Sequence, residues 1–84
     1  MIDLKSLSLE LYNQHVIVTF RKETECHKKY GQSLNGILVG RIWGDRLDGK
    51  QTISTVIGII LKINSNEINI YSMEIENIEI YPEL

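Results

Sequence analysis

The sequence predicts a mostly β fold, in which five short strands form a small barrel that follows a short N-terminal helix. Isoleucine is the commonest residue, with fourteen copies, and alanine is absent. This composition favours strands, because β-branched side chains lose rotamer freedom in a helix. Apolar and polar residues also alternate over several short runs, as they do in strands with one buried face. The length of 84 residues predicts a single domain over residues 1–84, since chains of this size build one core.

The N-terminal helix is predicted over residues 3–12. Asp3 is a candidate N-cap, and Leu4, Leu7 and Leu11 follow it at helical spacing. Leucines also occur two residues apart in this stretch, so a strand remains the alternative.

The first two strands are predicted over 15–22 and 33–43. Residues 23–32 between them are polar and have no sustained period, which predicts a loop or a mobile hairpin tip. Gly36 and Gly40 lie inside the second strand, where glycine typically marks a bulge, a bend or a close backbone approach. We therefore expect this strand to be strongly bent.

A turn is predicted over residues 44–51, because Asp48-Gly49 is a favourable turn dipeptide. The third strand follows over 52–63, and Asn64-Ser65-Asn66 predicts a hairpin loop that leads to a fourth strand over 67–71.

The last strand is predicted over 78–81 and ends at Pro82. Ile75 and Ile78 are three residues apart and break the alternation of the preceding strand. A short helical turn between the two strands would reset the register. Strands bent by glycines and joined by such a turn predict a closed barrel, which removes exposed sheet edges.

The apolar residues outnumber what one barrel interior requires. Six side chains are expected to point inward: Val16, Val18, Leu38, Ile57, Ile59 and Leu61. Four more would then point outward and need a cover: Ile37, Val39, Val56 and Ile60. The leading helix can supply part of this cover, and the remainder predicts an oligomer or a protein partner.

A leading helix is followed by the strand His15-Val16-Ile17-Val18-Thr19-Phe20, the bent strand Leu34-Asn35-Gly36-Ile37-Leu38-Val39-Gly40 and two closing strands. This order of elements resembles the Sm-like variety of SH3-type small barrels. The order and length are also similar to small Rof-type inhibitors of the Rho terminator, whose barrels bind a protein. The resemblance implies a fold rather than a function.

Members of the Sm-like group that bind uridine-rich RNA place Asp and Asn after the bent strand and an Arg-Gly pair before the last strand. Asp45 could match the first position, but no Asn follows in that loop, and residues 72–77 contain neither Arg nor Gly. The resemblance therefore does not extend to the RNA pocket.

Residues that could carry catalysis or hold a metal are sparse. Cys26, His27 and His15 are too few for a zinc site, and neighbours on an extended chain point in different directions, which makes Cys26 and His27 a poor nucleophile and base. We expect no enzyme activity and no cofactor. The lone cysteine, the absence of a signal-peptide pattern and the short apolar runs predict a cytoplasmic protein without a membrane segment.

Charge is unevenly distributed along the chain. Residues 21–50 carry a balance of +3 and residues 51–84 a balance of −4, within a total of −2. A basic segment with aromatic side chains could contact a nucleic-acid backbone and unpaired bases. The candidate residues for this RNA-binding alternative are Arg21, Lys22, Lys28, Lys29 and Tyr30.

The function predicted from these features is a non-enzymatic module that binds a protein, either a second copy or a target. Aromatic and Arg side chains are favoured anchors at such surfaces, so the candidate contacts are Trp43, Arg41, Arg46, Ile37 and Val39. A third hypothesis is a phage or mobile-element inhibitor of a host protein, which would mimic an acidic surface through Glu67, Glu74, Glu76, Glu79 and Glu83.

Overall fold

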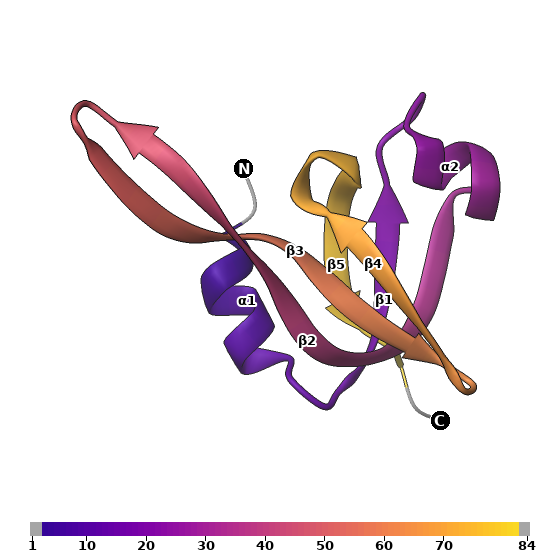
Figure 1. Cartoon of the computed structure of the whole chain (residues 1–84). Coiled ribbons are helices and arrows are strands. Elements are labelled where there is room, and N and C mark those ends of the chain that lie inside the picture. The colour runs from indigo at the N-terminus through magenta and orange to yellow at the C-terminus, as the bar shows by residue number, and fades with distance from the viewer. Residues whose placement is uncertain (1–2, 83–84) are drawn as a thin grey trace.

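The computed structural model describes residues 3–82 and contains one antiparallel sheet of five strands in the order β4-β3-β2-β1-β5 (Figure 1). The elements are α1 (Leu4–Glu10), β1 (His15–Phe20), α2 (Glu25–Tyr30), β2 (Ser33–Asp48), β3 (Gln51–Ile63), β4 (Asn66–Tyr71), the 3-10 helix η1 (Ser72–Glu74) and β5 (Ile75–Ile80). The mostly β fold with a leading helix is confirmed. Glu83, one of the residues proposed to mimic an acidic surface, lies outside the described residues.

The predicted closure of the barrel is wrong. Among the described strands, β4 pairs with β3 alone and β5 pairs with β1 alone, so these two strands are the edges of the sheet. The chain passes from one edge to the other through the three residues of η1. The curled sheet is therefore joined across its open side by a helical turn and not by a strand ladder.

The leading helix is confirmed and the strand alternative is excluded. The carboxylate of Asp3 caps α1 by accepting hydrogen bonds from the Ser6 hydroxyl at 2.9 Å and the Ser6 backbone N–H at 3.4 Å. These hydrogen bonds lower the pKa of Asp3. The helix ends at Glu10, before the predicted residue 12, and Asn13 then adopts a positive φ of 65° that turns the chain into β1.

The predicted loop over 23–32 is wrong, because six of these residues form α2. Thr24 is its N-cap, with the hydroxyl accepting from the His27 backbone N–H at 3.2 Å. Gly31 ends it with a φ of 88°, a conformation that glycine adopts without steric cost. Tertiary contact completes the helix, since Cys26 is buried and the Tyr30 ring lies 6.1 Å from the Phe20 ring.

The predicted turn over 44–51 is also wrong, because β2 and β3 continue through it as a long hairpin. Their pairing runs out to Asp48 opposite Gln51, and only Gly49 and Lys50 form the turn. Asp48-Gly49 is confirmed as the turn dipeptide, with a φ of 66° at Gly49. The Ile57 side chain occupies the space beside Gly44. A Cβ added at Gly44 would lie only 2.7 Å from Cδ1 of Ile57, so the hairpin requires a residue without a side chain here.

Two irregularities bend this hairpin and change which residues face the core. The register shifts between Leu38 and Gly40, which confirms the bend expected there. A second shift between Ile42 and Trp43 leaves Ile57 as an extra residue of β3. Ile57 was expected to point inward and Val56 outward, and this prediction is wrong. Val56 is buried, whereas Ile57 is half-buried.

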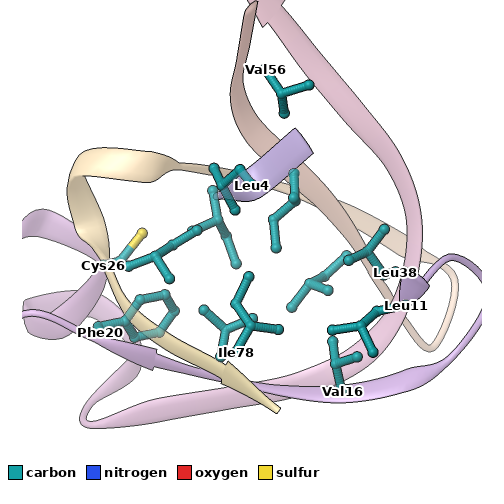
Figure 2. Packing of buried hydrophobic residues seen from close by; sticks show 13 residues of the cluster. Leu4, Leu11, Val16, Phe20, Cys26, Leu38, Val56 and Ile78 are labelled. Atoms are coloured by element: carbon teal, nitrogen blue, oxygen red, sulfur yellow. The ribbon is translucent and has the colours of Figure 1, made fainter. Parts of the chain in front are cut away.

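The core fills the concave side of the sheet (Figure 2). The five other residues expected to point inward have no exposed surface: Val16, Val18, Leu38, Ile59 and Leu61. Helix α1 packs against β3 and β2 and contributes Leu4, and its C-cap residue Leu11 joins the same core. Val56 is buried as well, while Ile37, Val39 and Ile60 are left half-buried on the sheet.

The last strand begins at Ile75, three residues before the predicted start. The helical turn expected in this region is confirmed as η1. The three-residue step from Ile75 to Ile78 has a second cause, because the register against β1 shifts between Thr19 and Phe20 and leaves Glu76 unpaired. Both isoleucines are buried as a result. No helix within residues 3–82 has the length and apolar character required to cross a membrane.

Candidate functional site

The outer part of the hairpin between β2 and β3, residues 43–56, is here called the arm and extends away from the rest of the molecule (Figure 1). The molecule measures 48 × 28 × 24 Å along its principal axes. Within the arm, every residue from 45 to 52 is exposed. The arm therefore presents two strands to solvent that contribute nothing to the core beyond their root at Val56.

One face of the arm carries a line of large side chains from β2. Side chains two apart on a strand share a face, so Arg41, Trp43 and Leu47 lie along one face of β2, with Asp45 between Trp43 and Leu47. The Arg41 guanidinium lies 5.7 Å from the centre of the Trp43 ring, in a cation–π arrangement. Trp43 is 51% exposed and Leu47 is 77% exposed.

The five residues predicted as protein contacts do not form one patch. Arg41 and Trp43 lie together at the root of the arm, whereas Arg46, an odd number of positions away, lies on the opposite face. Ile37 and Val39 belong to the lower half of β2, where Ile37 pairs with His15 and Lys62 and Val39 is the extra residue of the bulge.

Leu47 was not among the predicted contacts. It falls inside the stretch predicted as a turn, where an exposed apolar residue has no assigned direction. The strand-forming residues Thr52, Ile53 and Thr55 on the other side of the turn are the signal that could have extended the hairpin and revealed it.

The residues of the RNA-binding alternative have other contacts in the structure. Arg21 donates from Nε to the Ile75 carbonyl at 2.9 Å, and Lys28 lies 4.0 Å from the Glu25 carboxylate. Lys29 lies 5.3 Å from the centre of the Tyr30 ring, and this ring packs against the core. Lys22 is exposed. The only aromatic ring of this set is thus half-buried, which reduces the area available for stacking on a base.

The lone thiol lies in the core beside a carboxylate. Cys26 is buried, and its backbone N–H donates to Oε2 of Glu74 at 3.0 Å. Burial raises the pKa of the Cys26 thiol from 9.0 to about 12, and a hydrogen bond of the thiol itself to the Glu74 carboxylate and the negative charge of Glu74 act in the same direction. A thiolate is the reactive form of cysteine, so this thiol is a weak nucleophile at neutral pH.

His15 lies in a separate polar cluster. Its Nε2 is 3.0 Å from Oδ1 of Asn35, and its ring stacks on Tyr81 with centroids 4.3 Å apart. His27 lies in α2, so the two histidines belong to different elements. Across residues 3–82, no three His, Cys, Asp or Glu side chains gather as ligands for a metal ion.

Comparison of the chain with known protein families, with curated proteins and with solved structures finds no match. The class defined by the geometry is a small, open, antiparallel β protein with a projecting hairpin arm.

Proposed function

We propose that this chain is a non-enzymatic interaction module whose arm binds a protein partner, either a second copy or a target. The observation that carries this proposal is the line of exposed Trp43 and Leu47 on one face of the arm. Trp and Arg are the side chains most enriched among residues that dominate binding energy, and Arg41 holds its guanidinium beside the Trp43 ring.

The cost of building the arm supports a binding role. A two-stranded ribbon without a covered face is only marginally stable in water, and residues 45–52 are all exposed. A chain with a small core gains little stability from such an extension. A surface that becomes covered on binding would supply the missing apolar contact.

We further propose that the fold is an open variant of the SH3-type, Sm-like small barrels. The strand order β4-β3-β2-β1-β5, the leading helix and the helical turn before the last strand support this relationship. Small barrels of this type carry many unrelated functions, so the arm and not the fold supports the binding role.

The experiment compares partner capture by the wild-type chain and by the double variant Trp43→Ser/Leu47→Ser. The tagged chain is incubated with extract from its native host, and sedimentation velocity on the purified chain detects a second copy as the partner. We expect the double variant to lose at least about tenfold in affinity, because two anchor side chains are removed. Trp43 is the single tryptophan of the chain, so its fluorescence reports contact at the arm directly.

A matched control replaces two exposed side chains outside the arm, Tyr12→Ser/Ile80→Ser. Tyr12 is 51% exposed and Ile80 is 60% exposed, so the loss of exposed apolar surface is comparable. Equal loss in both variants, or no loss in the arm variant, would contradict the proposal. Recovery of nucleic acid whose binding falls steeply between low and moderate salt would favour the RNA-binding alternative instead.

A further inference from the structure

A cleft of about 510 Å³ lies where three distant parts of the chain meet. Its walls come from the start of α1, from the root of the arm, and from the residues around η1 and the end of β1. This volume is within the usual range for sites that hold a small molecule or a few side chains. The cleft combines two kinds of lining, one cationic and one apolar.

The polar lining carries an excess of positive charge. Lys5, Arg21 and Arg46 face the cleft together with a single acidic residue, Asp3. The Asp3 carboxylate already accepts two hydrogen bonds from Ser6. Within residues 3–82 the one ion pair joins Lys28 and Glu25, so none of the three cations of the cleft lies within 4.0 Å of a carboxylate there. Beside the hydrogen bonds from Ser6, the charge of Lys5 helps to lower the pKa of Asp3. The cleft lining thus carries three positive charges against one negative charge, in a chain whose net charge is −2.

One of these cations is held in position. The Nε of Arg21 donates to the Ile75 carbonyl at 2.9 Å, and the Arg21 backbone N–H donates to the Glu74 carbonyl at 2.9 Å. A guanidinium fixed through Nε keeps its two terminal nitrogens free to donate in parallel, the geometry that matches a carboxylate or phosphate. The hydroxyl side chains of Ser72 and Thr55 also line the cleft and can donate to the same group.

The apolar lining favours a peptide over a nucleic acid. Leu4, Ile57 and Met73 contribute hydrocarbon and thioether surface, and Met73 is 76% exposed. Flexible methionines adapt to the shape of bound side chains. Among the described residues that line the cleft none is aromatic, so a base would find no ring on which to stack.

We propose that this cleft binds an acidic residue flanked by apolar side chains in a peptide segment of the protein partner. The carboxylate pairs with Arg21 and Arg46, and the flanking side chains pack on Leu4, Ile57 and Met73. The inference rests on the proposed function, and it names the chemistry of the partner. Neighbouring residues on a strand face opposite ways, so β2 can direct Arg46 into the cleft while Leu47 contacts the partner on the other face.

The test titrates the purified chain with N-acetyl-Leu-Glu-Leu-amide and follows backbone amide shifts by NMR. N-acetyl-Leu-Gln-Leu-amide is the matched uncharged peptide, while inorganic phosphate and oligo-uridylate represent the phosphate ligands. We expect the acidic peptide to shift Arg21, Arg46 and Ser72, and to bind at least about tenfold more tightly than the uncharged one, because hydrogen bonds to charged groups are the strong ones.

The variant Arg21→Gln/Arg46→Gln should weaken the acidic peptide by at least about tenfold. Lys28→Gln/Lys62→Gln removes the same number of charges outside the cleft and should leave binding unchanged. Because Arg21 also anchors the chain near Ile75, Arg46→Gln is measured by itself, and a loss with this single variant and an unchanged melting temperature supports the proposal.

Four outcomes would overturn the proposal: equal binding of both peptides, shifts that map outside the cleft, tighter binding of phosphate or oligo-uridylate at the same residues, or self-association that Arg21→Gln/Arg46→Gln abolishes. The last outcome would make a second copy the occupant. The variant Trp43→Ser/Leu47→Ser separates the two proposals. If it loses the partner while the cleft variants do not, the arm proposal stands and the cleft proposal fails.

Discussion

Gly58 shows how closely single residues are fitted in this sheet. A Cβ at this position would lie 2.6 Å from the Ile70 carbonyl oxygen and 3.2 Å from the Tyr71 Cα, both backbone atoms of β4. At Gly40 the nearest atom to such a Cβ would be Cδ1 of Ile60, at 3.1 Å. The end of an isoleucine side chain can rotate away, whereas a backbone in a ladder cannot.

Gly58→Ala is therefore expected to destabilise the protein by about 1–3 kcal/mol, the usual cost of an overpacked interior. Gly40→Ala should cost less than about 1 kcal/mol, because Ile60 can adjust and the unfolded chain loses freedom. Urea unfolding followed by circular dichroism measures both. Equal costs at the two glycines would show that β4 moves freely away from β3, contrary to the packing described above.

Cys26 offers a second test at the residue scale. At pH 8, a thiol with a pKa of about 12 has a thiolate fraction about a thousand times smaller than a thiol with the ordinary pKa of 9.0. We expect a disulfide reagent to react with the native protein at least about 100-fold more slowly than with the urea-unfolded chain, since only the thiolate attacks. Native and unfolded rates within about threefold of each other would contradict the buried position of the thiol.

Among the elements, α2 is the one that local sequence signals and tertiary contacts form together. Its six residues are too few for a stable isolated helix. At its start, the Thr24 hydroxyl accepts a hydrogen bond from the His27 backbone N–H, and at its end the Gly31 backbone N–H donates to the His27 carbonyl. Cys26 and Tyr30, four residues apart, pack one face of the helix against the core. The helix therefore depends on caps and packing and not on intrinsic propensity.

Replacing the cap by Thr24→Ala should destabilise the protein by about 1 kcal/mol, because the His27 backbone N–H loses its partner. Thr24→Ser keeps an acceptor at the same place and should remain within a few tenths of a kcal/mol of the wild type. Thermal unfolding of the three proteins measures the difference. A stable Thr24→Ala variant would mean that packing of Cys26 and Tyr30 alone maintains α2.

In the whole molecule, the arm and the remainder of the described chain, here called the body, differ in how many buried side chains stabilise them. The body encloses residues without exposed surface on four of its strands. The arm has cross-strand pairs and the Ser54 hydroxyl donating to Asp45 at 3.2 Å, but no buried side chain beyond its root. Local stability is therefore expected to fall along the same two strands from body to tip.

Amide hydrogen exchange tests this gradient. Leu38, Ile59 and Leu61 should be among the slowest amides, while hydrogen-bonded amides of residues 45–54 should exchange at least about 100-fold faster, because opening the arm exposes little apolar surface. Protection of the arm equal to that of the body in the isolated chain would mean that a second copy already covers it. Addition of the true partner should raise protection in the arm selectively.

The parts of this fold that were predicted from the sequence depend on local chemistry. The helix capped by Asp3, the Asp48-Gly49 turn, the bend at Gly40 and the helical turn before β5 each follow from the residues at that place. For the candidate site, Trp43 and Arg41 were predicted from residue type alone, and the structure places them together. The exposed Leu47, further along the same face, was missed because the length of the hairpin was underestimated.

Alternation and capping act over a few residues, so the strand-rich class, the leading helix and most of the inward-facing side chains could be predicted from the sequence. Contacts between remote segments complete α2, bring Val56 and not Ile57 into the core, and leave the sheet open. The same packing brings Lys5, Arg21 and Arg46 to one cleft from three distant segments. Register shifts and packing between remote segments decide these features, and a local pattern contains no information about which distant strand or helix will lie beside it.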